Sequence, residues 1–290
     1  MHRFLLHNGD VHDASATLLT PGQVGVLNGW GVFSTIRVRD GVLFAYERHY
    51  ARMKRDAGVM RVPFAWSEEE LEGALLRLVE ANGAQNATLR VAVIRNRGGM
   101  WEGPGVRRDA DLVAFTAPLN DWGAAVRLGV VRDGRHAASR FAGTKVLSWA
   151  QNLVWYEEAH ERGYDEVVLL NERGEVSECT SANVFIARGV DVLTPPLSAG
   201  CLPGVTRELL VTGEVSVPGI RVQESNILLN DLENADEVFI TSTTRNLLPV
   251  AEVEGLRIRQ GQSIREALQK AFSRYMDGYV QKRLALAGQR

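Results

Sequence analysis

The chain has 290 residues, 45% of them hydrophobic and 23% charged, the profile of a globular protein with room for two domains. Basic and acidic residues nearly cancel, at 33 against 35, so we expect neither a nucleic-acid-binding surface nor an acidic tail. With two cysteines, no recognisable secretion signal and no apolar run of roughly 20 residues, the sequence favours a cytoplasmic protein without disulfides or membrane spans.

The first 60 residues predict strands followed by a helix. Strands are expected over 3–7, which is mostly apolar, and over 31–39, which is rich in β-branched residues. The dipeptide Asp40-Gly41 after the second strand favours a two-residue hairpin turn. The helical pattern over 47–57 is expected to end at Gly58, a residue type common just after a helix.

A second helix is predicted to open at Ser67, where Glu70 stands at the spacing of a capping box. Two apolar runs, 87–94 and 112–117, are buried-strand candidates. The polar, proline-containing stretch that follows breaks this pattern and is interpreted as a linker. The predicted organisation is therefore a small N-terminal domain over 1–117, a linker over 118–124 and a larger C-terminal domain over 125–290.

The C-terminal part alternates strands and helices. A helix of about four turns is expected over 147–162, directly after Lys145, so that this lysine would lie where a loop becomes a helix. A short helix is expected to start near Gly204. The remaining expected elements are strands over 126–131, 166–170, 183–187 and 237–241, and a long helix over 263–283.

Lys145 is the first candidate for chemistry. The chain contains only four lysines among its 33 basic residues, so a lysine directly before the apolar residues Val146 and Leu147 is unusual for this sequence. Burial disfavours the ammonium form of a lysine, and the neutral amine is a nucleophile toward an aldehyde. The alternative is a lysine whose stem lies on the protein surface and whose charge stays in water, and this motif alone does not decide between the two.

Three further segments have residue types suited to binding a charged cofactor. Glu178 is followed by small polar residues and a strand, so its carboxylate could face a ring nitrogen. Gly204-Val205-Thr206 and Ser242-Thr243-Thr244 could cradle an anion with backbone N–H groups and hydroxyls. Arg52 could add a charged contact. Each is also compatible with an ordinary turn, a helix start or a solvated side chain, which is the commoner case for a single Glu or a helix arginine.

Other common sites are not indicated. His2, His7 and His12 recur every five residues, a spacing that alternates the faces of a strand, and no cysteine or carboxylate cluster completes a metal site. No metal is therefore expected. The phosphate-loop and dinucleotide fingerprints are also absent from the sequence.

Taken together, the motifs resemble those of the fold-type IV pyridoxal-phosphate enzymes, the class IV aminotransferase family. This family includes branched-chain and D-amino-acid aminotransferases and 4-amino-4-deoxychorismate lyases. The resemblance extends over about residues 8–250. Its six motifs, in the family's order, are Gly29-Trp30-Gly31-Val32-Phe33, 47–53, Lys145, 178–185, 202–207 and 241–250.

The resemblance implies a role for each matching residue. Lys145 would bind pyridoxal 5′-phosphate covalently and move a proton during catalysis, and Glu178 would pair with the pyridine nitrogen. The other implied cofactor-binding residues are Arg52, Leu202, Val205, Thr206, Ser242 and Thr243. The implied substrate-binding residues are Trp30, Arg37, Arg95 and Thr244.

The resemblance also implies a fold and an activity. The expected fold is α/β (α+β), with a small N-terminal α/β sandwich, a larger C-terminal α/β pseudo-barrel and the cofactor in the cleft between them. The family is typically homodimeric, and the loop over 98–105 would close the partner's site. The expected activity moves an amino group between an amino acid, branched-chain-like or D, and a 2-oxo acid.

Three departures keep an alternative open. Asn28 stands where an aromatic ring is usual, Ser34 where the transaminases usually carry Glu, and Trp149 where the branched-chain enzymes carry Tyr. The segment around Ser34 is more similar to the lyases, whereas residues 202–207 are more similar to the transaminases. The alternative is a 4-amino-4-deoxychorismate lyase that releases pyruvate.

Overall fold

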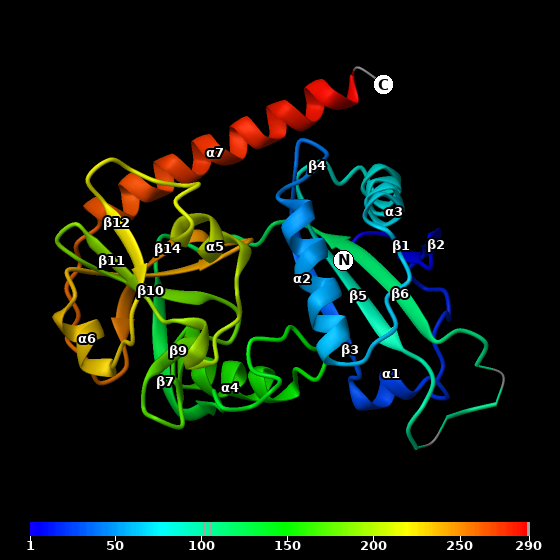
Figure 1. The fold of residues 1–290 in the computed structure, drawn as a ribbon, viewed down its shortest axis with the longest axis horizontal. Helices are drawn as coiled ribbons and strands as arrows, with labels where there is room; N and C mark the ends of the chain where they lie inside the picture. The colour runs from blue at the N-terminus through cyan, green and yellow to red at the C-terminus, as the bar shows by residue number, and fades with distance from the viewer. Residues whose placement is uncertain (101, 105, 289–290) are drawn as a thin grey trace. The chain divides into compact units, whose positions relative to one another are not determined.

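The computed structural model describes residues 1–100, 102–104 and 106–288, which form two compact units (Figure 1). The first unit comprises Met1–Asn120, Thr144–Trp149 and Gly278–Arg290, and the second comprises Asp121–Gly143 and Ala150–Asp277. The domains expected from the sequence assign residues 144–149 to the C-terminal part. In the structure this short segment belongs to the first unit.

The first unit contains an antiparallel sheet of six strands in the order β2-β1-β6-β5-β3-β4. The predicted hairpin turn is confirmed, since Asp40 and Gly41 have φ values of 50° and 76° between β3 and β4. The strands are β1 (Phe4–His7), β2 (Asp10–Asp13), β3 (Gly31–Arg39), β4 (Val42–Leu43), β5 (Ala87–Arg95) and β6 (Ala110–Ala117). The helices are α1 (Val24–Asn28), α2 (Tyr46–Val59) and α3 (Glu68–Ala81).

Helices α2 and α3 share one apolar core with this sheet. Met53 of α2 and Leu75 of α3 are buried in the same cluster as Ile36 of β3, because every second residue of the strand faces the helices. The predicted capping box of α3 is confirmed, with the Ser67 side chain accepting a hydrogen bond from the Glu70 backbone N–H.

The predicted end of α2 at Gly58 is wrong. The helix continues through Gly58 to Val59, and Gly58 does not have a positive φ. The next residue, Met60, ends the helix in an ordinary right-handed conformation. A glycine ends a helix only where the chain turns left-handed, and here the apolar contacts of α2 carry the helix past it.

The second unit contains a mixed sheet of eight strands that curls on itself, in the order β12-β11-β10-β13-β14-β7-β8-β9 (Figure 1). Its strands are β7 (Val126–Arg135), β8 (Glu166–Asn171), β9 (Val176–Cys179), β10 (Asn183–Arg188), β11 (Asp191–Thr194), β12 (Arg221–Glu224), β13 (Glu237–Ser242) and β14 (Asn246–Val253). Its α-helices are α4 (Ala150–Glu161), α5 (Val205–Val211) and α6 (Leu229–Asn234), and residues Leu197–Ala199 form a 3-10 turn. The long helix α7 (Ser263–Ala287) begins in this unit. Among the helices of the described residues, none is long and apolar enough to cross a membrane.

The predicted helix over 147–162 begins later than expected. Helix α4 starts at Ala150, and the residues directly before it are not helical; Val146 forms an antiparallel bridge to Val32 of β3. Lys145 therefore does not lie where a loop becomes a helix. The helical periodicity of Leu147 and its successors could not reveal this, because pairing with a strand more than 100 residues earlier satisfies the same backbone groups.

Candidate active site

Lys145 lies in a backbone segment that is fixed against β3. The Phe33 backbone N–H donates to the Lys145 carbonyl at 3.0 Å, and the Leu147 N–H donates to the Gly31 carbonyl at 2.9 Å. The Lys145 side chain is half-buried, with its Nζ 4.5 Å from the centroid of the Phe33 ring. Strand β3 thus fixes the backbone of Lys145 and of the residues that follow it.

A buried carboxylate that the sequence analysis missed also holds this segment. The Asp56 side chain is almost fully buried on α2 and accepts a hydrogen bond from the Lys145 backbone N–H at 3.0 Å. Its other oxygen accepts from the Arg55 Nε at 2.9 Å. The sequence spacing could have identified Asp56, because it follows Arg52 by four residues and therefore lies on the same face of the helix.

Arg52 is buried on α2, next to a hydroxyl and an imidazole. Its Nη2 donates to the Ser34 Oγ at 3.0 Å, and the same Oγ lies 2.8 Å from the His49 Nδ1. Burial lowers the pKa of His49 well below its ordinary value of 6.5, and the nearby charges of Arg52 and Lys145 lower it further. The sequence analysis singled out Ser34 only as a departure from the family and did not single out His49 at all.

Trp30 and Arg95 contact each other. The Arg95 guanidinium carbon lies 4.3 Å from the Trp30 ring centroid, a cation–π contact. Arg95 also donates to the backbone carbonyls of Arg97 and Arg61, and Trp30 donates from its indole to the Met60 carbonyl at 2.7 Å. These two predicted substrate-binding residues thus form one cluster beside the end of α2.

Two more arginines, both half-buried, lie on neighbouring strands in the layer that contains the buried ring of Phe33. The Arg90 guanidinium carbon of β5 is 3.9 Å from the centroid of the Phe33 ring, which the Lys145 Nζ also contacts. Burial lowers the pKa of Arg90, and burial and then Arg39 lower that of Arg37. Arg37 was predicted as a substrate-binding residue, whereas Arg90 was missed. Together with Lys145 they make this layer positively charged.

In the second unit, Glu178 lies at the end of β9 with both carboxylate oxygens occupied. The Arg135 Nε donates to one oxygen at 2.8 Å, and the Leu202 backbone N–H donates to the other at 3.0 Å. Arg135 also donates to the Asn152 side chain of α4 at 3.1 Å. The sequence analysis missed Arg135, which is 43 residues from Glu178 and shares no local pattern with it.

The loop after Leu202 is packed closely against β10. The Asn183 side chain donates to the Leu202 carbonyl at 2.9 Å, and a Cβ added to Gly204 would meet the Asn183 Oδ1 at 2.1 Å. A side chain at this position would require the Asn183 side chain to move. The two predicted anion-binding residues that follow, Val205 and Thr206, are buried at the start of α5.

The turn that contains Ser242, Thr243 and Thr244 connects β13 to β14. Ser242 pairs with Asn246, and the Ser242 Oγ accepts a hydrogen bond from the Arg245 backbone N–H at 3.2 Å. The Arg245 side chain is buried and forms an ion pair with Glu166 of β8 at 3.2 Å. The three predicted residues are half-buried.

Comparison with known proteins decides the family. The model of the family described as amino-transferase class IV matches residues 31–253. The chain belongs to the class IV aminotransferases.

Relatives of this aminotransferase are named for two substrate types. It is 28% identical to a putative branched-chain-amino-acid aminotransferase of Methanocaldococcus jannaschii, over 93% of this chain and 94% of the relative. It is 30% identical to a D-alanine aminotransferase of Bacillus licheniformis, over 89% and 90%.

Solved structures agree with the fold. A branched-chain aminotransferase from Thermoproteus uzoniensis superimposes with a TM-score of 0.86, at 27% identity and 98% coverage of both chains. A putative 4-amino-4-deoxychorismate lyase from Legionella pneumophila superimposes with a TM-score of 0.82, at 21% identity and 90% and 97% coverage. The second likeness shows the fold alone. The predicted α/β fold of two domains is confirmed.

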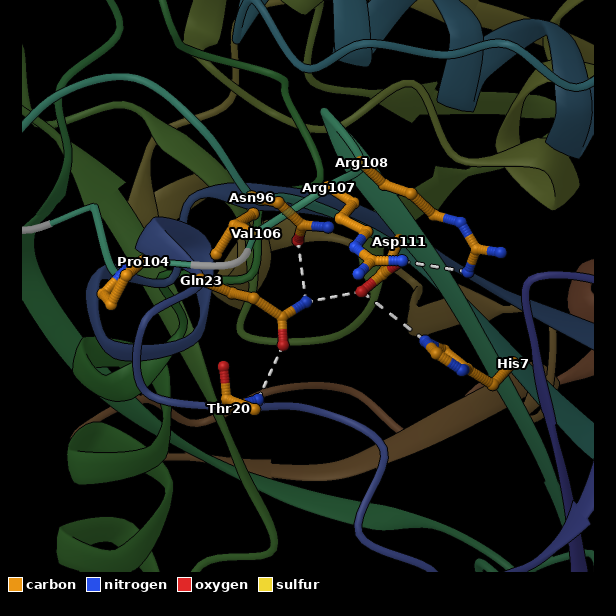
Figure 2. A pocket seen from close by; sticks show the side chains of 9 residues that line it. All are labelled: His7, Thr20, Gln23, Asn96, Pro104, Val106, Arg107, Arg108 and Asp111. Atoms are coloured by element: carbon orange, nitrogen blue, oxygen red, sulfur yellow. Dashed lines mark hydrogen bonds and ion pairs between the residues drawn. The ribbon is translucent and has the colours of Figure 1, made fainter.

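The predicted site residues of this aminotransferase divide between the two units. Those in the first unit are Trp30, Arg37, Arg52, Arg95 and Lys145. Those in the second unit are Glu178, Leu202, Val205, Thr206, Ser242, Thr243 and Thr244. A cavity of about 380 Å³ in the first unit includes His7, Gln23 and Asp111 in its lining but none of the predicted site residues (Figure 2). The Asp111 carboxylate of this cavity accepts a hydrogen bond from Gln23 and forms ion pairs with His7 and Arg108, as the dashed lines in Figure 2 mark.

Proposed function

We propose that this aminotransferase is pyridoxal-phosphate dependent, that Lys145 binds the cofactor, and that it moves an amino group between an amino acid and a 2-oxo acid. The observation that carries the proposal is that Lys145, in a chain of this family, has a backbone held against β3 and a half-buried side chain. When bound, pyridoxal phosphate supplies an aldehyde that joins the amino group and a ring that takes up electron density.

The residues of each unit fit such a cofactor by their chemistry. The first unit supplies an amine, at Lys145, and a buried guanidinium, at Arg52, which match an aldehyde and a phosphate. In the second unit, Gly204 leaves its backbone uncovered by a side chain, and the Thr241 Oγ1 is buried with no hydrogen-bond partner among the described residues. A ligand with several acceptor oxygens would satisfy the Thr241 hydroxyl, whereas the Gly204 N–H already donates to the Leu202 carbonyl at 2.9 Å.

Each residue then has a defined task. The Lys145 Nζ would hold the cofactor and afterwards move a proton of the substrate. Glu178, held in place by Arg135 and the Leu202 N–H, would pair with the pyridine nitrogen. The remaining proposed cofactor contacts are Arg52, Leu202, Val205, Thr206, Ser242 and Thr243.

The positively charged side chains around Phe33 favour a substrate that carries a carboxylate. Arg37 and Arg90 are partly desolvated cations, and a substrate carboxylate would offset that cost. Trp30, Arg95 and Thr244 remain proposed substrate contacts. The relatives support a branched-chain or D-amino acid as the donor.

The assembly and location are also proposals. We propose a cytoplasmic homodimer, with the loop over 98–105 closing the partner's site. Positions 101 and 105 of that loop lie outside the described residues.

Visible spectroscopy tests the activity. The protein purified with pyridoxal phosphate is titrated singly with L-leucine, L-glutamate and D-alanine, without an acceptor. We expect one donor to bleach the yellow colour, which would also give the preferred enantiomer. A yellow protein that none of them bleaches would favour the lyase, and aminodeoxychorismate would then be tested for pyruvate release. A protein that takes up no cofactor would overturn the proposal.

A lysine variant tests the attachment. Lys145→Ala should lose covalent attachment of the cofactor, measured as the mass of the borohydride-reduced protein, and should lose transamination by more than about a thousandfold. The matched control is Lys54→Ala, because Lys54 is exposed on α2. It should keep the adduct and the activity. An adduct of full yield in Lys145→Ala would place the cofactor on another lysine.

A further inference from the structure

Three side chains of the first unit form a buried hydrogen-bonded cluster. Ser34 of β3 and His49 of α2 are both 0% exposed, and Arg52 is 9% exposed. The Ser34 Oγ lies 3.0 Å from the Arg52 Nη2 and 2.8 Å from the His49 Nδ1, so the hydroxyl bridges the other two side chains. His49 and Arg52 are one helical turn apart, so that both point to the same strand.

The chemistry of the groups determines the direction of these hydrogen bonds. A guanidinium has only donors, so the Ser34 Oγ accepts from Arg52 and directs its own hydrogen elsewhere. The His49 Nδ1 lies 3.5 Å from the same Arg52 nitrogen, and a proton on Nδ1 would face that donor. The consistent arrangement is a hydroxyl that donates to an unprotonated Nδ1, with the imidazole proton on Nε2.

The surroundings keep the imidazole in this neutral form. His49 is fully buried, and burial lowers its pKa well below 6.5, with further contributions from Arg52 and Lys145. Within the described part of the chain the His49 Nε2 has no hydrogen-bond partner. Burying a donor without a hydrogen-bond partner is costly, so His49 at this position lowers the free energy of unfolding.

We propose that Ser34 and His49 are positioning residues that orient the Arg52 guanidinium toward the phosphate of the cofactor. This inference rests on the proposed function. Both positioning groups are neutral, so neither of them offsets the positive charge of the guanidinium that would attract a phosphate. A restrained arginine loses less side-chain entropy on binding than a mobile one, and the affinity for phosphate rises accordingly.

The proposal also gives the Ser34 departure a function. A hydroxyl at position 34 can accept from Arg52 and donate to His49 at the same time, whereas alanine can do neither. Threonine retains the hydroxyl and suits a strand. The bridging hydroxyl, rather than the size of the residue, is therefore the property under test.

The experiment compares the dissociation constants of pyridoxal 5′-phosphate and of pyridoxal, which lacks the phosphate, for the same apoprotein. Ser34→Ala should weaken pyridoxal phosphate about tenfold, the effect of about one lost hydrogen bond, and leave pyridoxal unchanged. Ser34→Thr should restore most of the phosphate preference. Equal weakening of both ligands would show a general structural role and overturn the proposal.

A double-mutant cycle with Arg52 shows whether the effect passes through the arginine. Arg52→Gln should remove most of the preference for the phosphorylated ligand, and Ser34→Ala added to it should cost little more. Additive losses would mean that Ser34 acts independently of Arg52, which would also overturn the proposal.

Thr116→Val serves as the matched control. Thr116 is a fully buried hydroxyl of the same unit, bonded to His2 at 2.8 Å and to Asn82 at 2.9 Å. Its loss should lower the melting temperature but not the phosphate preference. Failure of the proposed function is recognised separately, because a wild-type protein that binds neither ligand would contradict pyridoxal-phosphate dependence itself.

Discussion

At the scale of single residues, the buried polar groups of the first unit are arranged around cations. The Asp56 carboxylate holds the backbone of Lys145, and the Phe33 ring contacts both Lys145 and Arg90. His49 is fully buried and lies near Arg52 and Lys145, so its pKa is lowered and its imidazole stays neutral when the protein is folded. The ionisation of this one residue therefore links the stability of the unit to pH.

We expect the free energy of unfolding to fall as the pH falls below 6.5. The pKa of His49 is far below 6.5 in the folded protein and ordinary in the unfolded chain, so below 6.5 the unfolded chain binds the extra proton. This contribution is complete above 6.5 and is lost at about 1.4 kcal/mol per pH unit below it. Urea unfolding of the wild type and of His49→Gln at several pH values measures the difference in slope. Equal slopes would mean that His49 is protonated in the folded protein.

At the scale of elements, β3 connects α2 to the segment that contains Lys145. The chain enters β3 through Gly29, whose φ is 60° and whose added Cβ would meet the Ser148 Cα at 2.9 Å. Glycine is required there, because other residues rarely adopt a positive φ and the space is filled by backbone. Gly58, in contrast, lies inside α2 with nothing within 4 Å of an added Cβ.

These two glycines should respond in opposite directions to the same substitution. Gly58→Ala should stabilise the protein by about 0.5–1 kcal/mol, since alanine loses less backbone entropy in a helix. Gly29→Ala should destabilise it by more than about 1 kcal/mol and displace the Ser148 segment. Urea denaturation of both variants, with Gly29→Ala also assayed for the cofactor adduct, measures this. A stabilised Gly29→Ala would contradict the close packing of the Lys145 segment.

At the scale of the whole molecule, each unit contains several of the predicted site residues, and long-range polar contacts connect the segments that carry them. In the second unit the Glu166–Arg245 ion pair, almost fully buried, joins β8 to the turn after β13. Glu166 also accepts from Ser181 at 2.7 Å, just after Glu178, and Arg245 lies 3.8 Å from the Trp122 ring centroid. This pair thus ties two candidate cofactor-binding segments together.

Removing one partner of the pair should cost more than removing both. Arg245→Met leaves a buried carboxylate uncompensated and should lower the free energy of unfolding by about 3 kcal/mol or more. The double variant Glu166→Gln with Arg245→Met should recover part of this loss, because no lone charge remains. Chemical denaturation of the wild type, both single variants and the double variant completes the cycle. Purely additive effects would mean that the two side chains do not interact.

Several features followed from local sequence alone. The capping box at Ser67, the hairpin turn at Asp40-Gly41 and the strand Gly31–Arg39 depend on neighbours within a few residues, and the structure confirms each. The family follows from motifs whose order is itself a property of the sequence, and the family model confirms it. The roles of the individual site residues remain predictions.

Other features were decided only by tertiary structure. The non-helical backbone at Lys145 pairs with β3, the partner of Glu178 is Arg135, and His49 lies opposite Ser34. Gly58 stays helical because the contacts of α2 outweigh its own preference. Periodicity and turn chemistry act between near neighbours, so the sequence by itself determined elements and family. The partners of buried charged groups lie far apart along the chain, and only the packed sheets brought them together.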